Sequence, residues 1–306
     1  MTLELRVDAV TEACPGVRSV AFTRADGGPP PSYPPGSHLG LEWAPGRWNA
    51  YSLTGTSITP DRWHVSVALR RDGSGGSRRM HRLRPGDRMR ATMPRSGFAP
   101  VDTARRHLLV AGGIGVTPVL SHVRWHAFWG NPFSVLYVHR TGAAPHLDEL
   151  RELCGDRLTT VTGRAAAAGR ILRLVTTAPF GSHLYSCGPP GLTAAVGAAA
   201  RDAHWVDARV HSEDFERRTE PGRPFRAVLR RSGRTVEVGA AESLLDAVHR
   251  IGVAAPSLCR NGVCGECLTP VRHGAVEHRD AVHAGLDGRI ALCVSRAAGP
   301  ALELDL

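Results

Sequence analysis

Apolar and polar residues alternate along the first hundred residues in the way that half-buried β-strands require. The clearest run is Trp63-His-Val65-Ser-Val67-Ala-Leu69, in which every second residue is large and apolar. Proline and glycine cluster between such runs, as in Gly27-Gly-Pro-Pro-Pro31. Short strands separated by turns predict an antiparallel barrel or sandwich over residues 1–102.

Residues 103–216 change to short apolar runs that alternate with helix-like segments. The runs that predict strands are 107–110, 134–138, 157–161 and 182–186, and the predicted helices are 116–129, 146–154 and 191–203. Alternating strands and helices favour a parallel sheet with helical crossovers. We therefore expect a second, α/β domain here.

The polar segment 217–224 carries two prolines and predicts a linker. After it, residues 225–229 and 235–238 have the pattern of a hairpin around Ser232-Gly233, and a helix is expected over Glu242–Ile251. Residues 290–294 are predicted as a further strand. Residues 225–306 would form a third domain.

Composition narrows the class of protein. The chain has 306 residues, 42% hydrophobic and 22% charged, as expected for a soluble globular protein of two or three domains. Its net charge of +10 is spread along the chain without a basic, aromatic-rich stripe, so we expect no nucleic-acid partner. The longest nearly apolar stretch, 108–120, is too short and too glycine-rich to span a membrane, so no membrane partner is predicted either. The chain opens without an apolar signal segment, so we expect a cytoplasmic location.

Four cysteines near the C-terminus form the most specific motif. Cys259, Cys264 and Cys267 have the spacing C-x4-C-x2-C, and Cys293 follows on a separate segment. This arrangement is typical of a plant-type [2Fe-2S] cluster, in which Gly262 and Gly265 allow the ligand loop to turn tightly. A zinc site is the alternative, but zinc ribbons usually contain two C-x2-C pairs. Disulfides are less compatible with a reducing cytosol.

Two motifs of the α/β segment follow predicted strands. Gly112-Gly-Ile-Gly115-Val-Thr117-Pro118 leads from a strand into a helix and could offer N–H groups to a pyrophosphate. Cys187-Gly188-Pro189 follows the last predicted strand. Because ligands bind at the carboxyl edge of a parallel sheet, both motifs are expected to face one crevice. Taken alone, the glycine motif could almost equally be an ordinary strand-to-helix turn, and Cys187 is more typical of an ordinary buried cysteine before a turn.

Two motifs of the first segment could take part in binding a ligand, although each alone could be an ordinary strand or an ordinary flexible loop. Asn49-Ala-Tyr51-Ser52-Leu53 places an aromatic ring and a hydroxyl on one strand, and Gly75-Gly76-Ser77 lies in a loop whose amides could hold one phosphate. The loop would hold one phosphate and no platform for an adenine is evident, so any flavin bound here would be FMN rather than FAD.

Taken together and in this order, these motifs resemble the phthalate dioxygenase reductase family, which includes vanillate O-demethylase reductases. The resemblance implies a multidomain fold: an antiparallel flavin-binding β-barrel, an α/β parallel-sheet NAD(P)H-binding domain and an α+β plant-type ferredoxin domain of the β-grasp type. It covers essentially the whole chain.

The resemblance also implies roles for individual residues. Tyr51 and Ser52 would contact the flavin ring, with Ser52 near flavin N5, while Leu53, Ala68 and Leu69 would line the ring. Gly75, Gly76 and Ser77 would bind the FMN phosphate. Thr117 and Phe215 would approach the flavin from the nicotinamide side. The nucleotide would contact Gly112, Gly115, Pro118, Cys187, Gly188 and Pro189. Ser52, Cys187 and Glu213 are the residues expected at the site of hydride transfer.

One position departs from the family pattern. The family usually has Arg where this chain has Asn49, so the charge opposite the flavin phosphate would be missing unless Arg47, Arg78 or Arg79 supplies it. No acid follows the strand 134–138, and Arg140 could accept a 2′-phosphate, so NADPH is the alternative to the NADH that the family favours.

The function implied is an NAD(P)H-dependent oxidoreductase that passes electrons through FMN and a [2Fe-2S] cluster to a terminal oxygenase, foremost a Rieske non-haem iron enzyme. A cytochrome P450 or another haem acceptor is the neighbouring alternative. A redox-sensing metal-binding module is the rival from another class, and it would lack flavin absorption.

Overall fold

The computed structural model describes residues 2–73, 75–215, 221–258, 260, 262, 264–280 and 288–306. These residues divide into two compact units, one made of Met1–Trp43 and Ala50–Phe215 and the other of Ala44–Asn49 and Glu216–Leu306. The domain boundaries given above stay predictions. Among the described residues, no helix has both the length and the apolar character to cross a membrane.

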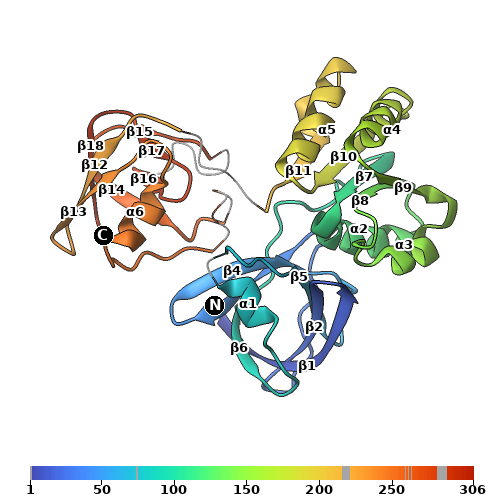
Figure 1. Ribbon diagram of the computed structural model, residues 1–306, viewed down its shortest axis with the longest axis horizontal. Helices are drawn as coiled ribbons and strands as arrows, with labels where there is room; N and C mark the ends of the chain where they lie inside the picture. Colours follow the sequence, from blue (N-terminus) through green and yellow to red (C-terminus); the bar gives the residue numbers. More distant parts are fainter. Residues whose placement is uncertain are drawn as a thin grey trace. The chain divides into compact units, whose positions relative to one another are not determined.

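The first sheet is six-stranded, with the order β4-β3-β6-β1-β2-β5 (Figure 1). Its strands are β1 (Thr2–Cys14), β2 (Val17–Arg24), β3 (His38–Ala44), β4 (Arg47–Ser52), β5 (Trp63–Ala68) and β6 (Arg88–Thr92), with the short helix α1 (Gly76–Met80) between β5 and β6. A bridge between Leu53 and Val65 brings the chain after β4 against β5, so the two edges of the sheet meet. The predicted alternation is confirmed, since Trp63, Val65 and Val67 are all buried in one core.

The second sheet is parallel throughout, with the order β11-β10-β7-β8-β9. Its strands are β7 (Arg106–Gly112), β8 (Phe133–His139), β9 (Leu158–Thr162), β10 (Ser182–Cys187) and β11 (Val210–Glu213). The connecting helices are η1 (Gly113–Gly115), α2 (Val116–Trp129), α3 (Leu147–Cys154), η2 (Gly155–Arg157), α4 (Arg164–Thr176), α5 (Pro190–Asp202) and η3 (Asp207–Arg209).

Each face of this sheet carries its own core. Leu109 and Tyr185 pack with residues of α2 and α3, whereas Leu108 and Leu184 pack with α4 and α5. Figure 1 shows α4 and α5 side by side on their face of the sheet. Successive residues of a strand point to opposite faces, so strands buried on both faces must be apolar almost continuously. The α/β prediction is confirmed, although α4 and β11 had not been predicted as elements.

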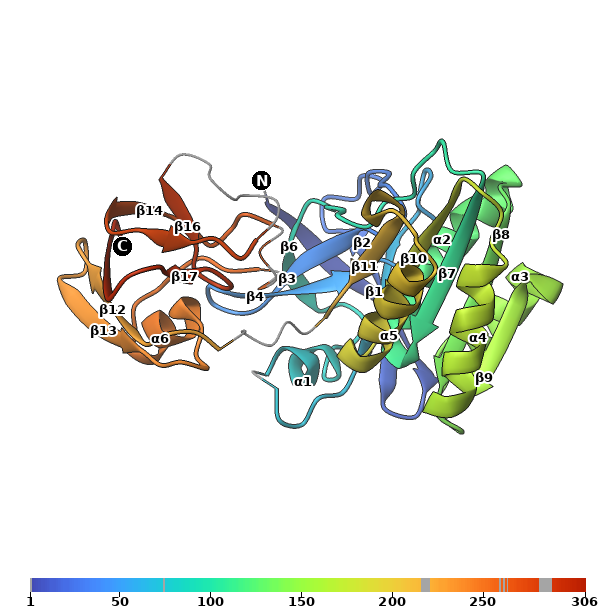
Figure 2. The ribbon, with the colours of Figure 1, turned by 90° about the horizontal axis from the view of Figure 1, so that it is seen from above.

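The third sheet is mixed, with the order β13-β12-β18-β14-β16, and a two-stranded sheet pairs β15 with β17 (Figure 1). Figure 2 shows this region, coloured orange to red, from above. The elements are β12 (Phe225–Leu229), β13 (Arg234–Val238), α6 (Leu244–Arg250), β14 (Leu268–His273), β15 (Val276–Glu277), β16 (Arg289–Ala291), β17 (Arg296–Ala297) and β18 (Ala301–Leu304). The hairpin is confirmed, and α6 packs on the sheet through four buried residues.

Two boundaries of this third region were predicted wrongly. The helix starts at Leu244 and not at Glu242, because Ser243 is its N-cap and accepts the Asp246 N–H at 3.0 Å. The strand expected over 290–294 ends at Ala291. A turn follows, in which the N–H groups of Val294 and Ser295 both donate to the Ala291 carbonyl.

Candidate functional site

The turn from β7 into α2 contains the first glycine motif. Gly113, φ +52°, is in the left-handed region with open space around it, so this glycine rather than Gly112 or Gly115 provides the backbone freedom. Pro118 is the third residue of α2, where its missing N–H costs no helical hydrogen bond. Thr117 is buried, and its hydroxyl donates to the Ile114 carbonyl at 3.0 Å. The turn is therefore held by its own groups.

The two predicted nucleotide motifs touch each other. A Cβ on Gly115 would lie 2.2 Å from the Cys187 carbonyl oxygen, and a Cβ on Gly112 would lie 2.8 Å from Pro189 Cδ. A Cβ on Gly188 would lie 2.9 Å from Gly112 Cα. Only glycine permits this approach because β7 and β10 are neighbouring parallel strands that end together. The structure brings both motifs together at this edge, and the crevice that they are expected to face stays a prediction.

Cys187 and Glu213 also meet at this edge. They are opposite each other in the pairing of β10 with β11. Glu213 Oε2 is buried and has no hydrogen-bond partner among the described residues. Burial, with a smaller effect of Asp214, raises the pKa of Glu213 to about 8. Burial followed by the two neighbouring carboxyls raises the pKa of Cys187 well above its usual value. Both groups are therefore protonated at neutral pH.

The remaining residues predicted on the nicotinamide side are more open. Arg140 is exposed just beyond β8, where a backbone bridge joins it to Ala143. Phe215 follows β11 and is 42% exposed. Open side chains at the carboxyl edge of a parallel sheet are accessible to a ligand.

The predicted flavin strand is the end of β4. Ser52 is buried and Tyr51 packs partly against the barrel core. Across from them, Ala68 is the last residue of β5 and is half-buried, and Leu69 is 39% exposed. The bridge of Leu53 to Val65 places the two strands next to each other. The barrel thus presents a partly apolar strip at which a planar ring could lie.

The phosphate loop is shorter than predicted because Gly76 already begins α1. Gly75 has φ +117°, and a Cβ there would lie 2.9 Å from the Trp43 ring, so no other residue fits. The Ser77 hydroxyl accepts from the Arg70 N–H at 3.0 Å and also contacts the Arg70 carbonyl oxygen at 3.2 Å. These contacts hold the loop against Arg70. Phosphate binding by the amides of Gly75, Gly76 and Ser77 stays a prediction.

Asn49 lies in β4 and is half-buried. Of the three arginines considered as replacements for the missing charge, Arg78 donates to the Arg71 carbonyl at 2.5 Å, and Arg47 is exposed. The effect of Asn49 on flavin binding stays a prediction.

Two of the predicted cluster ligands are adjacent. Cys267 Sγ and Cys293 Sγ are 3.2 Å apart, and both side chains are buried. The pairing of β14 with β16 brings them together, because Leu268 lies opposite Ala291 and the Leu292 N–H donates to the Cys267 carbonyl at 3.3 Å. The ligand segments therefore converge through ordinary sheet pairing.

The other two predicted ligands differ in what can be said. Cys264 is half-buried, and Cys259 lies outside the described residues. Within the described part, no group of three or more His, Cys, Asp or Glu side chains converges on a metal position, and none of the six cysteines forms a disulfide. At Gly262, φ +70°, a Cβ would lie 2.7 Å from both Asp280 Cβ and Val294 Cγ2. A thiol donor set on a loop that requires glycine fits an iron–sulfur cluster.

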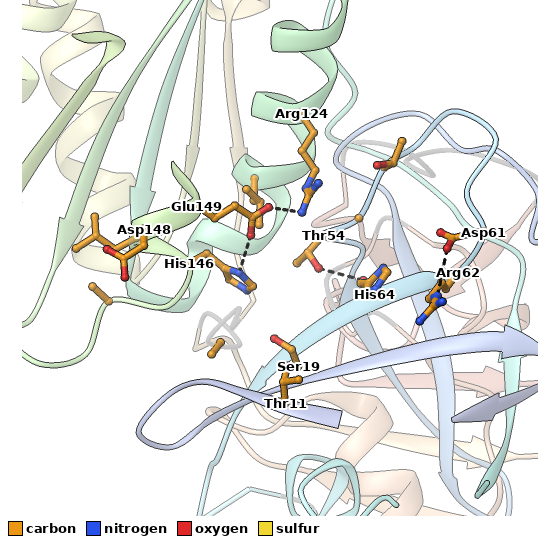
Figure 3. Close-up of a pocket in the computed structure, with 16 residues that line it drawn as sticks. Thr11, Ser19, Thr54, Asp61, Arg62, His64, Arg124, His146, Asp148 and Glu149 are labelled. Atoms are coloured by element: carbon orange, nitrogen blue, oxygen red, sulfur yellow. Dashed lines mark hydrogen bonds and ion pairs between the residues drawn. The ribbon is translucent and has the colours of Figure 1, made fainter. Parts of the chain in front are cut away.

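A cavity of about 400 Å³ lies in the first unit, and none of the predicted site residues lines it (Figure 3). Arg124 of α2 pairs with Glu149, which also contacts His146 Nδ1 at 3.3 Å. His146 Nε2 and Ser66 Oγ of β5 are 2.8 Å apart. This network links the α/β part of the unit to the barrel.

Family models match two parts of the chain. Residues 87–210 match the N-terminal domain of the dimethylamine monooxygenase subunit DmmA-like family, and residues 228–298 match the 2Fe-2S iron-sulfur cluster binding domain.

Relatives match the chain over its whole length. The chain is 38% identical to the haem-dependent oxidative N-demethylase beta subunit of Ectopseudomonas mendocina, with 99% of each chain covered. It is 33% identical to the phthalate 4,5-dioxygenase reductase subunit of Pseudomonas putida, with 99% and 96% covered. The solved structure of phthalate dioxygenase reductase matches with a TM-score of 0.76 and 30% identity, covering 100% of this chain and 98% of that one.

The fold and the site therefore define an electron-transfer oxidoreductase that uses a nicotinamide nucleotide, a flavin and a [2Fe-2S] cluster. The chain belongs to the phthalate dioxygenase reductase family, the reductase components of oxygenase systems.

Proposed function

We propose that this protein accepts hydride from NADH onto FMN and passes single electrons through a [2Fe-2S] cluster to an oxygenase partner. The observation that carries the proposal is the buried pair Cys267 and Cys293, whose Sγ atoms are 3.2 Å apart. In the same chain, the two motifs expected to bind the nucleotide touch each other at the ends of β7 and β10. When bound, the flavin supplies the change from a two-electron donor to a one-electron acceptor.

On the nucleotide side, the chain's contribution is backbone shape and one proton. The glycines of the two touching motifs, with Pro118 and Pro189, would form the floor on which the pyrophosphate lies, and Thr117 would face the flavin. Glu213, as a neutral carboxylic acid, can donate a hydrogen bond to a ligand oxygen beside Cys187. Arg140 is available for the adenosine side, where it would accept a 2′-phosphate if NADPH were used.

On the flavin side, Tyr51 and Ser52 would orient the ring, with Ser52 donating near N5. Leu53, Ala68, Leu69 and Phe215 would exclude water from its faces. The amides of Gly75, Gly76 and Ser77 would bind the phosphate, and Asn49 would add a neutral hydrogen bond in place of a charge.

The cluster would be held by Cys259, Cys264, Cys267 and Cys293. Thiolate ligation and use of the NADH pool both suit a reducing compartment, so we place the protein in the cytoplasm.

Two acceptors are compatible with the family. A Rieske oxygenase is the acceptor expected from the sequence resemblance. The relative that is 38% identical is the beta subunit of a haem-dependent oxidative N-demethylase. The family model that matches residues 87–210 describes a dimethylamine monooxygenase subunit. These two similarities favour a haem partner that oxidises an N-methylated amine.

The test begins with the purified chain. Chromatography after denaturation should give FMN, and iron and labile sulfide should each be present at two per chain. NADH-reduced protein is then mixed without oxygen with the haem subunits of the E. mendocina demethylase or with the oxygenase component of the P. putida dioxygenase. A faster change in haem absorption than in Rieske absorption supports the haem partner. Recovery of FAD, or zinc without sulfide, would refute the cofactor assignment.

A further inference from the structure

The segment between β6 and β7 joins the barrel to the parallel sheet within the first unit, and both sides hold it. On the barrel side, the His38 N–H donates to the Arg95 carbonyl at 2.8 Å, and the Arg95 N–H donates back at 3.1 Å. On the other side, the Val101 N–H donates to the Tyr185 hydroxyl at 2.8 Å. The joining segment is therefore fixed at two points.

His122 of α2 makes the contact between these two points. Its Nε2 lies 2.6 Å from the Phe98 carbonyl oxygen, and the side chain is completely buried. Because a carbonyl can only accept, Nε2 carries the proton and Nδ1 does not. Nδ1 has no hydrogen-bond partner among the described residues, and burial lowers the pKa of His122 to about 3. The ring is a neutral donor at any working pH.

The barrel closes on the same bond. A Cβ on Gly36 would lie 2.5 Å from the Phe98 carbonyl oxygen and 2.8 Å from His122 Nε2. The next residue, Ser37, accepts the Leu53 N–H at 2.8 Å. Leu53 directly follows Ser52, which we assign to the flavin. A short chain of contacts thus runs from α2 to the flavin strand.

The position of His122 on α2 gives this contact its meaning. α2 begins at Val116, directly after the glycine turn, and Thr117 is its second residue. A helix is stiff over this length, since His122 lies five positions after Thr117, a rise of roughly 7.5 Å. Any shift of His122 relative to the barrel therefore also moves the glycine turn, where the nicotinamide would lie, relative to the end of β4, where the flavin would lie.

We propose that His122 is a positioning residue for hydride transfer. Its bond to the Phe98 carbonyl sets the distance between the glycine turn at the end of β7, where the nucleotide would lie, and the end of β4, where the flavin would lie. This inference rests on the proposed function. Displacements of this kind reduce rates steeply, since a misplacement of about 1 Å can cost roughly a hundredfold.

The test compares His122→Phe with His126→Phe in the flavin-loaded full chain. His126 is one turn further along α2 and equally buried, but its side chain contacts Asn131 and neighbouring rings such as that of His107, not the joining segment. His122→Phe should reduce the rate constant of flavin reduction at saturating NADH by roughly tenfold, with the KM for NADH nearly unchanged. Hydrogen exchange of residues 95–105 should become faster in this variant only. Equal rates and equal exchange in the two variants would overturn the proposal.

A second pair of variants covers the case in which His122→Phe does not fold. Gly36→Ala and Gly27→Ala both place alanine at a positive φ, +75° and +79°, but only the first meets neighbouring atoms. Only Gly36→Ala should slow flavin reduction and increase exchange over residues 95–105, and equal behaviour of the two would refute the positioning role. If the wild type itself shows no NADH-dependent flavin reduction, the proposed function fails instead.

Discussion

Glu213 is the residue at which the structure adds most to the sequence. The sequence placed an acid near the nucleotide but gave no protonation state. Burial, followed by the neighbouring Asp214, raises its pKa to about 8. A protonated carboxyl donates a hydrogen bond that a carboxylate cannot. The state of this one proton should therefore control nucleotide reactivity near neutral pH.

We predict that Glu213→Gln makes flavin reduction by NADH independent of pH between about 7 and 9. The wild-type rate should fall as the pH rises through about 8 because the donor is lost, whereas the Gln amide keeps a donor. The free energy of unfolding should also fall as the pH rises. The pKa of Glu213 in the folded state lies above the usual 4.5, so the stabilisation that is fully present below pH 4.5 is lost as the pH rises through about 8. Stopped-flow rates and melting temperatures at each pH measure both effects.

The matched control is Glu12→Gln, at an exposed position of β1. It should keep the wild-type profile. A wild-type rate that stays flat through pH 8 would contradict a functional role for the Glu213 proton.

Single residues also mark the limit of sequence reasoning. The motif identified the glycine turn, but the residue at positive φ is Gly113, whereas Gly112 and Gly115 are required by the contact with Cys187 and Pro189. Which glycine serves which purpose depends on the neighbouring strand, so the local sequence cannot decide it.

At the scale of elements, α2 combines two roles. Its apolar residues and its start after the glycine turn were readable from the sequence, and its bounds, Val116–Trp129, agree with the prediction. Its histidines have no ligand spacing along the chain, so the sequence indicates only surface or core positions for them. In the fold, His122 and His126 are both buried, and the His126 ring lies 4.0 Å from that of His107 of β7.

These histidines should make the protein sensitive to acid. Burial, followed by the neighbouring His107 and His122, lowers the pKa of His126 to about 2. In the unfolded chain His126 binds a proton near pH 6.5, whereas in the folded chain it stays neutral to a much lower pH. The stabilisation of the folded state that is present above pH 6.5 is therefore lost as the pH falls toward 2. One such residue costs about 2 kcal/mol between pH 7 and pH 5.

We predict that His126→Phe reduces this loss by about that amount. Urea unfolding at pH 7 and pH 5 measures it as a smaller difference in the free energy of unfolding than in the wild type. The exposed His204, replaced by Phe, is the control. An identical pH dependence of wild type and His126→Phe would show that His126 is protonated in the folded state.

At the scale of the whole molecule, the predicted cluster ligands all lie in the second of the two units. The cysteine spacing identified the cluster, and sheet pairing explains why Cys267 and Cys293 meet although 26 residues separate them in the chain. The strand expected around Cys293 was wrong because the chain turns after Ala291. The cysteine spacing therefore predicts the chemistry of such a site better than it predicts the local backbone conformation. That conformation also depends on the bound metal and on pairing with the neighbouring strands.

The separation of units predicts that the two halves of the electron path can be uncoupled. Cys264→Ser replaces a thiolate ligand by a hydroxyl that binds iron poorly, so the cluster should be lost, with iron and labile sulfide close to zero. Apart from Ala44–Asn49, the barrel belongs with the parallel sheet to the other unit. Flavin reduction by NADH and ferricyanide reduction should therefore stay within about twofold of wild type, while electron transfer to a protein acceptor disappears. Cys14→Ser, at a half-exposed thiol of β1, controls for cysteine loss and should keep every activity. Full iron and sulfide in Cys264→Ser would remove Cys264 from the ligand set, and a parallel loss of flavin reduction would show that the first unit depends on the cluster for its own fold.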